Sequence, residues 1–107
     1  MTLRDERAAS MLLQLAAKYI AEEAGRTTLI TPTRALYGSD KKHVTIFVSV
    51  YPKEQLENAL AFLKRHKDLF RDYLKKHGRF SILPYITFEF DYGEENRQHL
   101  EEISREI

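Results

Sequence analysis

The segment His43–Tyr51 (HVTIFVSVY) constrains the fold more than any other part of this chain. Val44, Ile46, Val48 and Val50 occupy alternate positions along it. Such alternation predicts a β-strand with one apolar face turned to a core. A half-buried strand needs neighbouring strands and a covering layer. The rest of the chain must therefore supply a small sheet and the helices that pack on it.

The segment before this strand predicts its first partner. Residues 27–37 are rich in β-branched side chains, but Pro32 lies among them and cannot donate a ladder hydrogen bond. This predicts an edge strand that is bulged or broken at the proline. Residues 38–42 combine Gly, Ser and Asp in a turn-like run. A strand, a short turn and a second strand predict an antiparallel hairpin.

Two stretches have helical periodicity. Apolar residues recur at steps of three and four over residues 4–24, and Gly25 then suits the end of a helix. The second stretch starts after Pro52, which fits a first helical turn, and ends before Gly78. A straight helix of about 25 residues would be about 38 Å long, too long for so small a domain. Because the apolar pattern also lapses there, we expect a bend at residues 66–68.

The C-terminal part predicts one more strand and one more helix. Residues 81–91 alternate again, with Pro84 near their start. Residues 93–107 carry a thin apolar stripe and many acids. The predicted architecture is α+β, with helices covering one face of a three-stranded sheet. No linker interrupts it, so we expect one domain over residues 1–92, followed by an acidic helix over residues 93–107.

Composition excludes several classes of protein. The chain has 107 residues, a length that is typical of one domain. Its hydrophobic content of 43% is enough to form one core. It has no cysteine, so disulfides, thiolate metal sites and a cysteine nucleophile are absent. No apolar run is long enough to span a bilayer, and Asp5 and Glu6 argue against a signal peptide. We therefore expect a soluble intracellular protein.

No pattern in the sequence indicates catalysis. The four histidines are far apart, and none has metal-ligand spacing with another. There is no Gly-rich phosphate loop. His66 and Asp68 are two apart on a helix, so their side chains point in different directions. We expect no metal, no cofactor, no small-molecule substrate and no enzymatic activity.

Charge is unevenly distributed, although the formal net charge is only +1. Residues 61–80 carry seven basic and two acidic side chains, whereas residues 89–107 carry seven acidic and two basic ones. At helical spacing, Lys64, Lys67, Arg71 and Lys75 form a basic stripe that phosphates would attract. The alternative is a solvated helix face in which Lys64–Asp68 and Asp72–Lys76 are ordinary i,i+4 pairs.

Several residues resemble the ribosome-binding factor A family, assembly factors of the small ribosomal subunit. The best match runs from Leu60 to Asp91, with Leu69-Phe70-Arg71 on the helix and Pro84-x-Ile86-x-Phe88-x-x-Asp91 around the last strand. Asp40 and the strand Ile46–Ser49 also resemble the family. The resemblance covers residues 38–92 well and the first helix in pattern.

This resemblance implies a type II K-homology-like fold, α-β-β-α-α-β, here with a short C-terminal helix added. In the family a kinked helix junction, commonly Ala-x-Gly, replaces the GxxG loop of other K-homology domains. That place is occupied here by His66-Lys67-Asp68, without a glycine. The family's basic tail is replaced by the acidic segment.

The implied function is non-catalytic binding of small-subunit ribosomal RNA during maturation of that subunit, by a cytoplasmic monomer. Arg71 also fits the family motif, so it is alternatively a structural arginine. The other class of function is a protein-interaction or homodimerising module without RNA, using the edge strand and the last helix. The expected phosphate contacts are Arg34, Lys41, Lys42, Lys64, Arg65, Lys67, Arg71, Lys75 and Lys76.

Overall fold

The computed structural model describes residues 3–93, with side chains from residue 5 onward. The predicted order α-β-β-α-α-β is confirmed. The predicted C-terminal helix lies, apart from its first residue, outside the described residues. The elements are α1 (Leu3–Glu23), β1 (Leu29–Tyr37), β2 (His43–Tyr51), a 3₁₀ turn (Lys53–Gln55), α2 (Leu56–Arg65), α3 (Lys67–His77) and β3 (Tyr85–Phe90).

The three strands form one sheet in the order β1-β2-β3. β1 and β2 make the predicted antiparallel hairpin, and β3 adds to β2 in parallel. A parallel neighbour requires a crossover connection, and α2 and α3 together provide it. The sheet is therefore mixed, with β2 at its centre.

The irregularity predicted at Pro32 is a β-bulge. The register of β1 against β2 shifts between Pro32 and Arg34, so Thr33 is the extra residue. A proline lacks the N–H that an uninterrupted ladder needs, and an edge strand tolerates the interruption. The extra residue shifts the alternation of β1 by one position. Ile30 before the bulge and Ala35 after it therefore both face the core.

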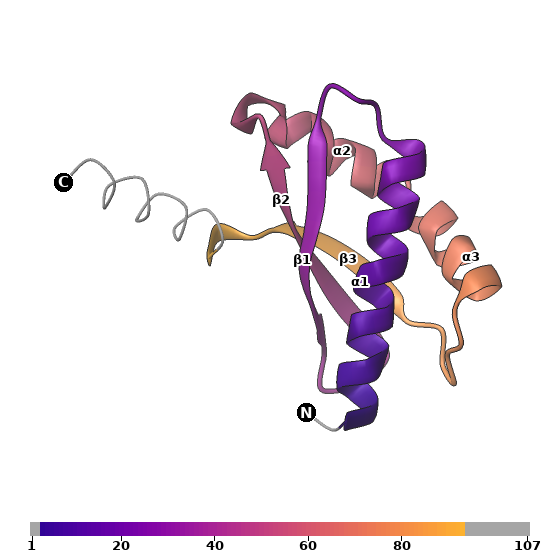
Figure 1. Cartoon of the computed structure of the whole chain (residues 1–107). Coiled ribbons are helices and arrows are strands. Elements are labelled where there is room, and N and C mark those ends of the chain that lie inside the picture. Colours follow the sequence, from indigo (N-terminus) through magenta and orange to yellow (C-terminus); the bar gives the residue numbers. More distant parts are fainter. Residues whose placement is uncertain (1–2, 94–107) are drawn as a thin grey trace.

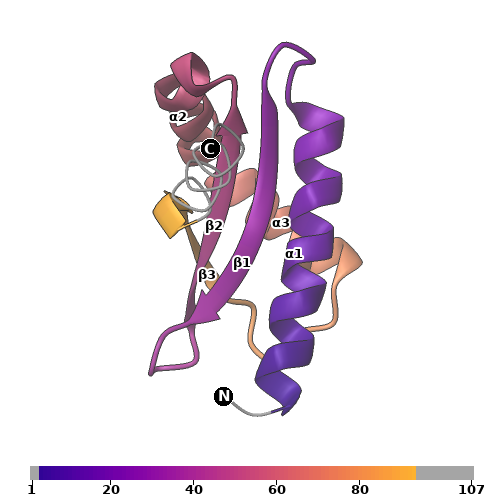
Figure 2. The same cartoon turned by 60° about the vertical axis from the view of Figure 1, so that its left-hand side comes forward.

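All three helices lie on one side of the sheet (Figures 1 and 2). α1 lies along β1 and beside α3, while α2 and α3 cover β2 and β3. Val44, Ile46, Val48 and Val50 of β2 are buried under these helices, as the alternation predicted. The opposite face of the sheet is half-buried to exposed, with Leu36 and Tyr51 among its exposed apolar residues.

The third strand is shorter than predicted. It begins at Tyr85, not at residue 81. The carbonyls of Leu83 and Pro84 accept hydrogen bonds from the Arg71 side chain, and the proline has no N–H for a strand ladder. Residues 81–84 therefore form a loop that is held to α3.

Pro52 is also outside the helix in which the sequence placed it. Its backbone is extended (φ −72°, ψ 160°), and the 3₁₀ turn separates it from α2. Pro52 therefore comes immediately before the 3₁₀ turn and is not itself helical. In the described part of the chain, no helix has both the length and the hydropathy that crossing a membrane requires.

Candidate nucleic-acid interface

The bend between α2 and α3 is concentrated in one residue, His66. Its backbone has φ −91° and ψ 2°, in the sparsely populated region between helix and strand. Its N–H still donates to the Phe62 carbonyl and its own carbonyl accepts from Phe70. Lys67 and Asp68, which the sequence grouped with His66, lie in the first turn of α3. The helix direction thus changes while local hydrogen bonding continues.

Aromatic contacts hold this bend in the absence of glycine. The Tyr19 hydroxyl lies 2.6 Å from Nδ1 of His66, and the rings of Phe62 and His66 are 4.2 Å apart at their centroids. The ring of Tyr19 also packs against Phe70 and Tyr73. Burial raises the pKa of the Tyr19 phenol, with a smaller contribution from the charge of Glu23. Tyr19 is one of the apolar residues that recur over residues 4–24, but no local pattern pairs it with His66, 47 residues away.

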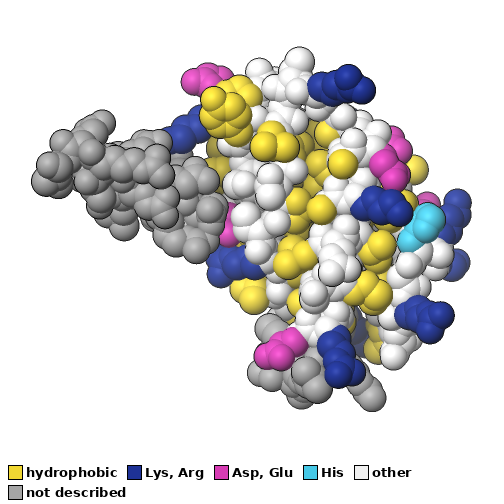
Figure 3. Space-filling view, viewed as in Figure 1, with side chains coloured by type: hydrophobic (Ala, Val, Ile, Leu, Met, Phe, Trp, Pro, Cys, Tyr) yellow, Lys and Arg dark blue, Asp and Glu magenta, His cyan; other side chains and the backbone are white. Residues whose placement is uncertain are grey.

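Exposed cations surround the bend and follow α3. Lys64 and Arg65 are in the last turn of α2, and Lys67 opens α3. Lys75 and Lys76 lie in the last turn of α3. Figure 3 shows several Lys and Arg side chains at the edge where α3 lies in Figure 1, and others elsewhere on the same face. We call these five residues the α2–α3 cations.

Arg71 differs from the α2–α3 cations because its guanidinium contacts the protein. Nε donates to the Pro84 carbonyl at 3.1 Å, and a terminal nitrogen donates to the Leu83 carbonyl at 3.2 Å. The guanidinium also lies 4.4 Å from the centre of the Tyr85 ring. These contacts join α3 to the start of β3, which fits the structural alternative that the sequence left open.

Two more of the expected contacts, Lys41 and Lys42, are in the β1–β2 turn. Lys41 has φ 62°, a left-handed conformation, and its ammonium is 2.6 Å from the Asp5 carboxylate. Asp40 accepts hydrogen bonds from the backbone N–H groups of Lys42 and His43. Those bonds, and one to the His43 ring, lower the pKa of Asp40 to about 2. The turn is thereby fixed with Lys42 exposed.

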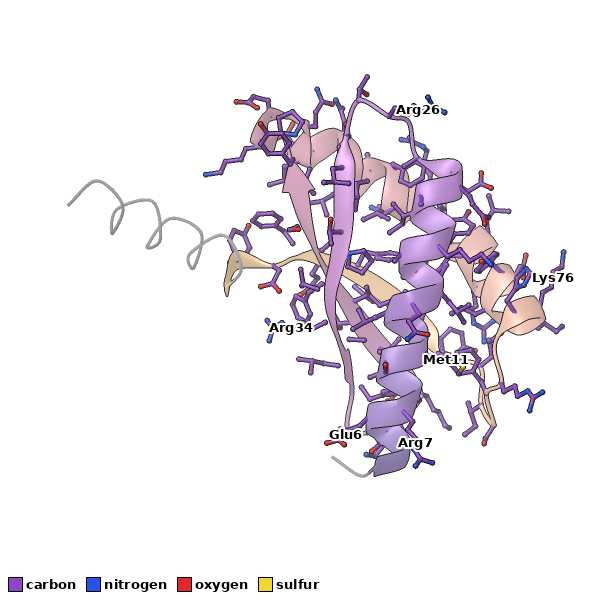
Figure 4. All side chains as sticks on the ribbon, in the orientation of Figure 1. Glu6, Arg7, Met11, Arg26, Arg34 and Lys76 are labelled. Atoms are coloured by element: carbon purple, nitrogen blue, oxygen red, sulfur yellow. The ribbon has the colours of Figure 1, made fainter. Side chains whose placement is uncertain are left out.

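Arg34 projects from the open face of the sheet. Its guanidinium lies 4.1 Å from the centre of the Phe47 ring, and Nε is 3.6 Å from the carboxylate of the buried Asp91. Thr33 contributes a second contact to that carboxylate. Figure 4 places Arg34 and Lys76 on opposite sides of the molecule. The nine expected contacts therefore lie at three places, the α2–α3 bend and helix, the β1–β2 turn and the sheet face.

The described residues contain no group of three or more His, Asp or Glu side chains that could hold a metal ion. The α2–α3 cations offer electrostatic contacts to a ligand. Exposed ammonium and guanidinium groups can contact phosphates, and such contacts position a nucleic acid without reading its bases.

Comparisons with known proteins agree with this architecture. A family model described as ribosome-binding factor A matches residues 4–104. The chain is 30% identical over 79 residues to ribosome-binding factor A of Thermosipho africanus, a match that covers 73% of this chain and 63% of that protein. It is 32% identical over 82 residues to the Beutenbergia cavernae protein of the same name, covering 76% of this chain and 52% of that protein. The chain thus matches about half to two thirds of the length of these relatives.

Two solved structures have the same fold. The solution structure of a Thermotoga maritima protein, described as a ribosome-binding factor A, has a TM-score of 0.69 at 23% identity and covers 82% of this chain and 87% of that one. The crystal structure of ribosome-binding factor A from Thermus thermophilus has a TM-score of 0.66 at 22% identity, covering 78% and 92% respectively. With the family model matching nearly the whole length, the chain belongs to the ribosome-binding factor A family.

Proposed function

We propose that this protein is a non-catalytic assembly factor that binds small-subunit ribosomal RNA while that subunit matures in the cytoplasm. Family membership supports a ribosomal partner. The observation that carries the RNA contact is the set of exposed α2–α3 cations around the bend at His66. In this proposal residues 1–92 are the RNA-binding domain and residues 93–107 are an acidic appendage.

The α2–α3 cations make the main contact. Five phosphate contacts would give a steep salt dependence, with affinity for single-stranded RNA falling on the order of 100-fold for a fourfold rise in salt. Lys41, Lys42 and Arg34 lie elsewhere on the surface, so they would contact other segments of the folded ribosomal RNA. Arg71 has a structural role in this proposal, because it fixes α3 against the loop before β3.

Co-sedimentation with purified ribosomal subunits tests the proposal. Immature and mature small subunits are each incubated with the protein at two salt concentrations. We expect binding that is stronger to the immature particle and that weakens at the higher salt concentration. No binding to either particle at low salt would refute the proposed function.

Charge reversal tests the location of the contact. Lys64→Glu, Lys67→Glu and Lys75→Glu are combined in one variant, which should fold normally because all three side chains are exposed. A matched control reverses Lys18, Arg26 and Lys53, which are exposed elsewhere and change the net charge equally. We expect only the first variant to lose binding. Equal loss in both variants would mean that overall charge, and not this surface, governs binding.

A homodimerising module remains the second candidate, because the open sheet face exposes large apolar side chains. Leu29, Leu36 and Tyr51 are 64%, 40% and 72% exposed. β1 is also an edge strand, which can pair with another strand. A dimer formed through this face would show a mass that rises with protein concentration and hardly responds to salt. A constant monomer mass would exclude it.

A further inference from the structure

A second surface feature is separate from the α2–α3 cations. An open hollow of about 740 Å³ lies between the first half of α1, the end of β1 and the loop that joins α3 to β3. Ligand sites are typically roughly 300–1,000 Å³. Arg7 and Met11 line it from α1, one helical turn apart, and Figure 4 shows both on the side of that loop. The hollow is thus large enough for a small organic group.

One side of the hollow is apolar and fixed by the loop. Phe80, Ile82 and Met11 line it. A Cβ added to Gly78 would be 2.3 Å from the Phe80 ring, so the ring lies directly against the glycine backbone. Ile82 is 57% exposed although it is large and apolar. This side therefore combines the half-buried ring of Phe80 with the exposed side chain of Ile82.

The rim of the hollow is cationic. Among the residues that the structure describes, Arg7, Arg79 and Lys41 line it together with one carboxylate, that of Asp5. Lys41 contacts this carboxylate at 2.6 Å and so offsets its charge. The Tyr37 phenol also lines the hollow, and burial, together with the charge of Asp5, raises its pKa. Arg7 and Arg79 are exposed and supply the excess positive charge.

An apolar floor beside two arginines suits a ligand with an aromatic plane and a phosphate. We propose that the hollow binds one unpaired nucleotide of an RNA strand, with the base against Phe80, Met11 and Ile82 and the phosphate at Arg7 and Arg79. The loop that carries Arg79 continues from the last turn of α3, where Lys75 and Lys76 lie, so an RNA strand along the end of α3 would reach the hollow. The inference rests on the proposed function, to which it adds a preference for single-stranded over duplex RNA.

Nuclear magnetic resonance of the methionine methyl groups tests the site without RNA. The chain has two methionines, Met1 and Met11, and Met11 lines the hollow. We expect adenosine monophosphate to shift the Met11 methyl signal, and inorganic phosphate or adenosine alone to shift it less. The double variant Arg79→Gln, Ile82→Ser should abolish the shift. An unchanged Met11 signal at saturating adenosine monophosphate would overturn the proposal.

RNA binding distinguishes this site from the main interface. The double variant should bind an unpaired oligonucleotide about 10-fold more weakly than the wild type does. Its affinity for duplex RNA should equal that of the wild type. Its control combines Arg26→Gln with Leu29→Ser, since Leu29 is 64% exposed but is outside the hollow and away from α2 and α3. If the double variant keeps wild-type affinity for unpaired RNA while reversal of Lys64, Lys67 and Lys75 still removes it, the hollow site is refuted and the proposed function stands. If the wild type binds no RNA at low salt, the proposed function and the RNA role of the hollow both fail.

Discussion

Arg71 is a basic residue on a basic helix, yet its hydrogen bonds are made to the protein's own backbone. It donates to the Leu83 and Pro84 carbonyls and lies over the Tyr85 ring. Arg71→Lys keeps the charge but cannot reproduce this planar geometry. We expect it to lower the free energy of unfolding by about 1–3 kcal/mol, measured by urea denaturation, because the hydrogen bonds involve a charged group. RNA affinity should be unchanged, and weaker RNA binding at unchanged stability would instead identify Arg71 as a phosphate contact.

Thr33 has a defined role as the bulge residue. Its hydroxyl is 2.5 Å from the carboxylate of Asp91, which is buried. Thr33→Val removes this donor while preserving the shape of the side chain. We expect a loss of about 1–3 kcal/mol in the free energy of unfolding, the cost of removing a hydrogen bond to a buried charge. Thr31→Val, at an exposed position of the same strand, is the control and should change stability little.

Asp40 predicts a pH dependence at the β1–β2 turn. Its pKa is lowered from 3.8 to about 2 by hydrogen bonds from the Lys42 backbone and the His43 side chain, with a further backbone bond from His43. Because the folded-state pKa is the lower one, the stabilisation is complete above about pH 4 and is lost as pH falls through 2. Carbon-13 titration of the carboxyl should show a midpoint near 2 in the folded protein. A midpoint near 3.8, as in the unfolded chain, would contradict these contacts.

Among the elements, those with a strong local pattern were predicted best. β2 has the predicted bounds because its alternation is uninterrupted, and α1 differs from its prediction by one residue at each end. The start of β3 was wrong because the Arg71 contacts to residues 83 and 84 are not encoded in any local pattern. The parallel pairing of β2 and β3 was not predicted, because it depends on how the α2–α3 crossover packs.

The bend at His66 was located by the sequence, but its physical cause is long-range. Tyr19 is 47 residues away from its partner. Tyr19→Phe removes only the hydroxyl, so we expect a loss of about 0.5–1.5 kcal/mol in unfolding free energy. Amide hydrogen exchange around residue 66 should accelerate, because this contact holds the bend. Tyr73→Phe leaves the hydrogen bond intact and is the control; equal acceleration in both variants would remove Tyr19 as the cause.

For the whole molecule, the sequence identified a charge imbalance but not its arrangement in space. The predicted basic stripe assumed helical spacing from residue 64 to residue 75. In the structure the bend at His66 divides these residues between α2 and α3. Arg71, which the stripe included, contacts the loop before β3. The nine expected phosphate contacts consequently occupy three places. Which cations share a surface depends on tertiary packing, and local spacing does not determine it.

This arrangement predicts that the cations respond differently to the size of the RNA. Arg34 and Lys76 are on opposite sides of the protein (Figure 4), so a short RNA hairpin bound at α3 cannot also reach Arg34. Lys64→Gln should reduce the slope of log affinity against log salt by about 0.7–0.9, for a hairpin and for the small subunit alike. Arg34→Gln should reduce that slope only for the whole subunit, whose folded RNA can contact both sides. If Arg34→Gln reduces the slope equally for the hairpin, the RNA contacts the sheet face directly. The main interface would then be the sheet face and not α2 and α3.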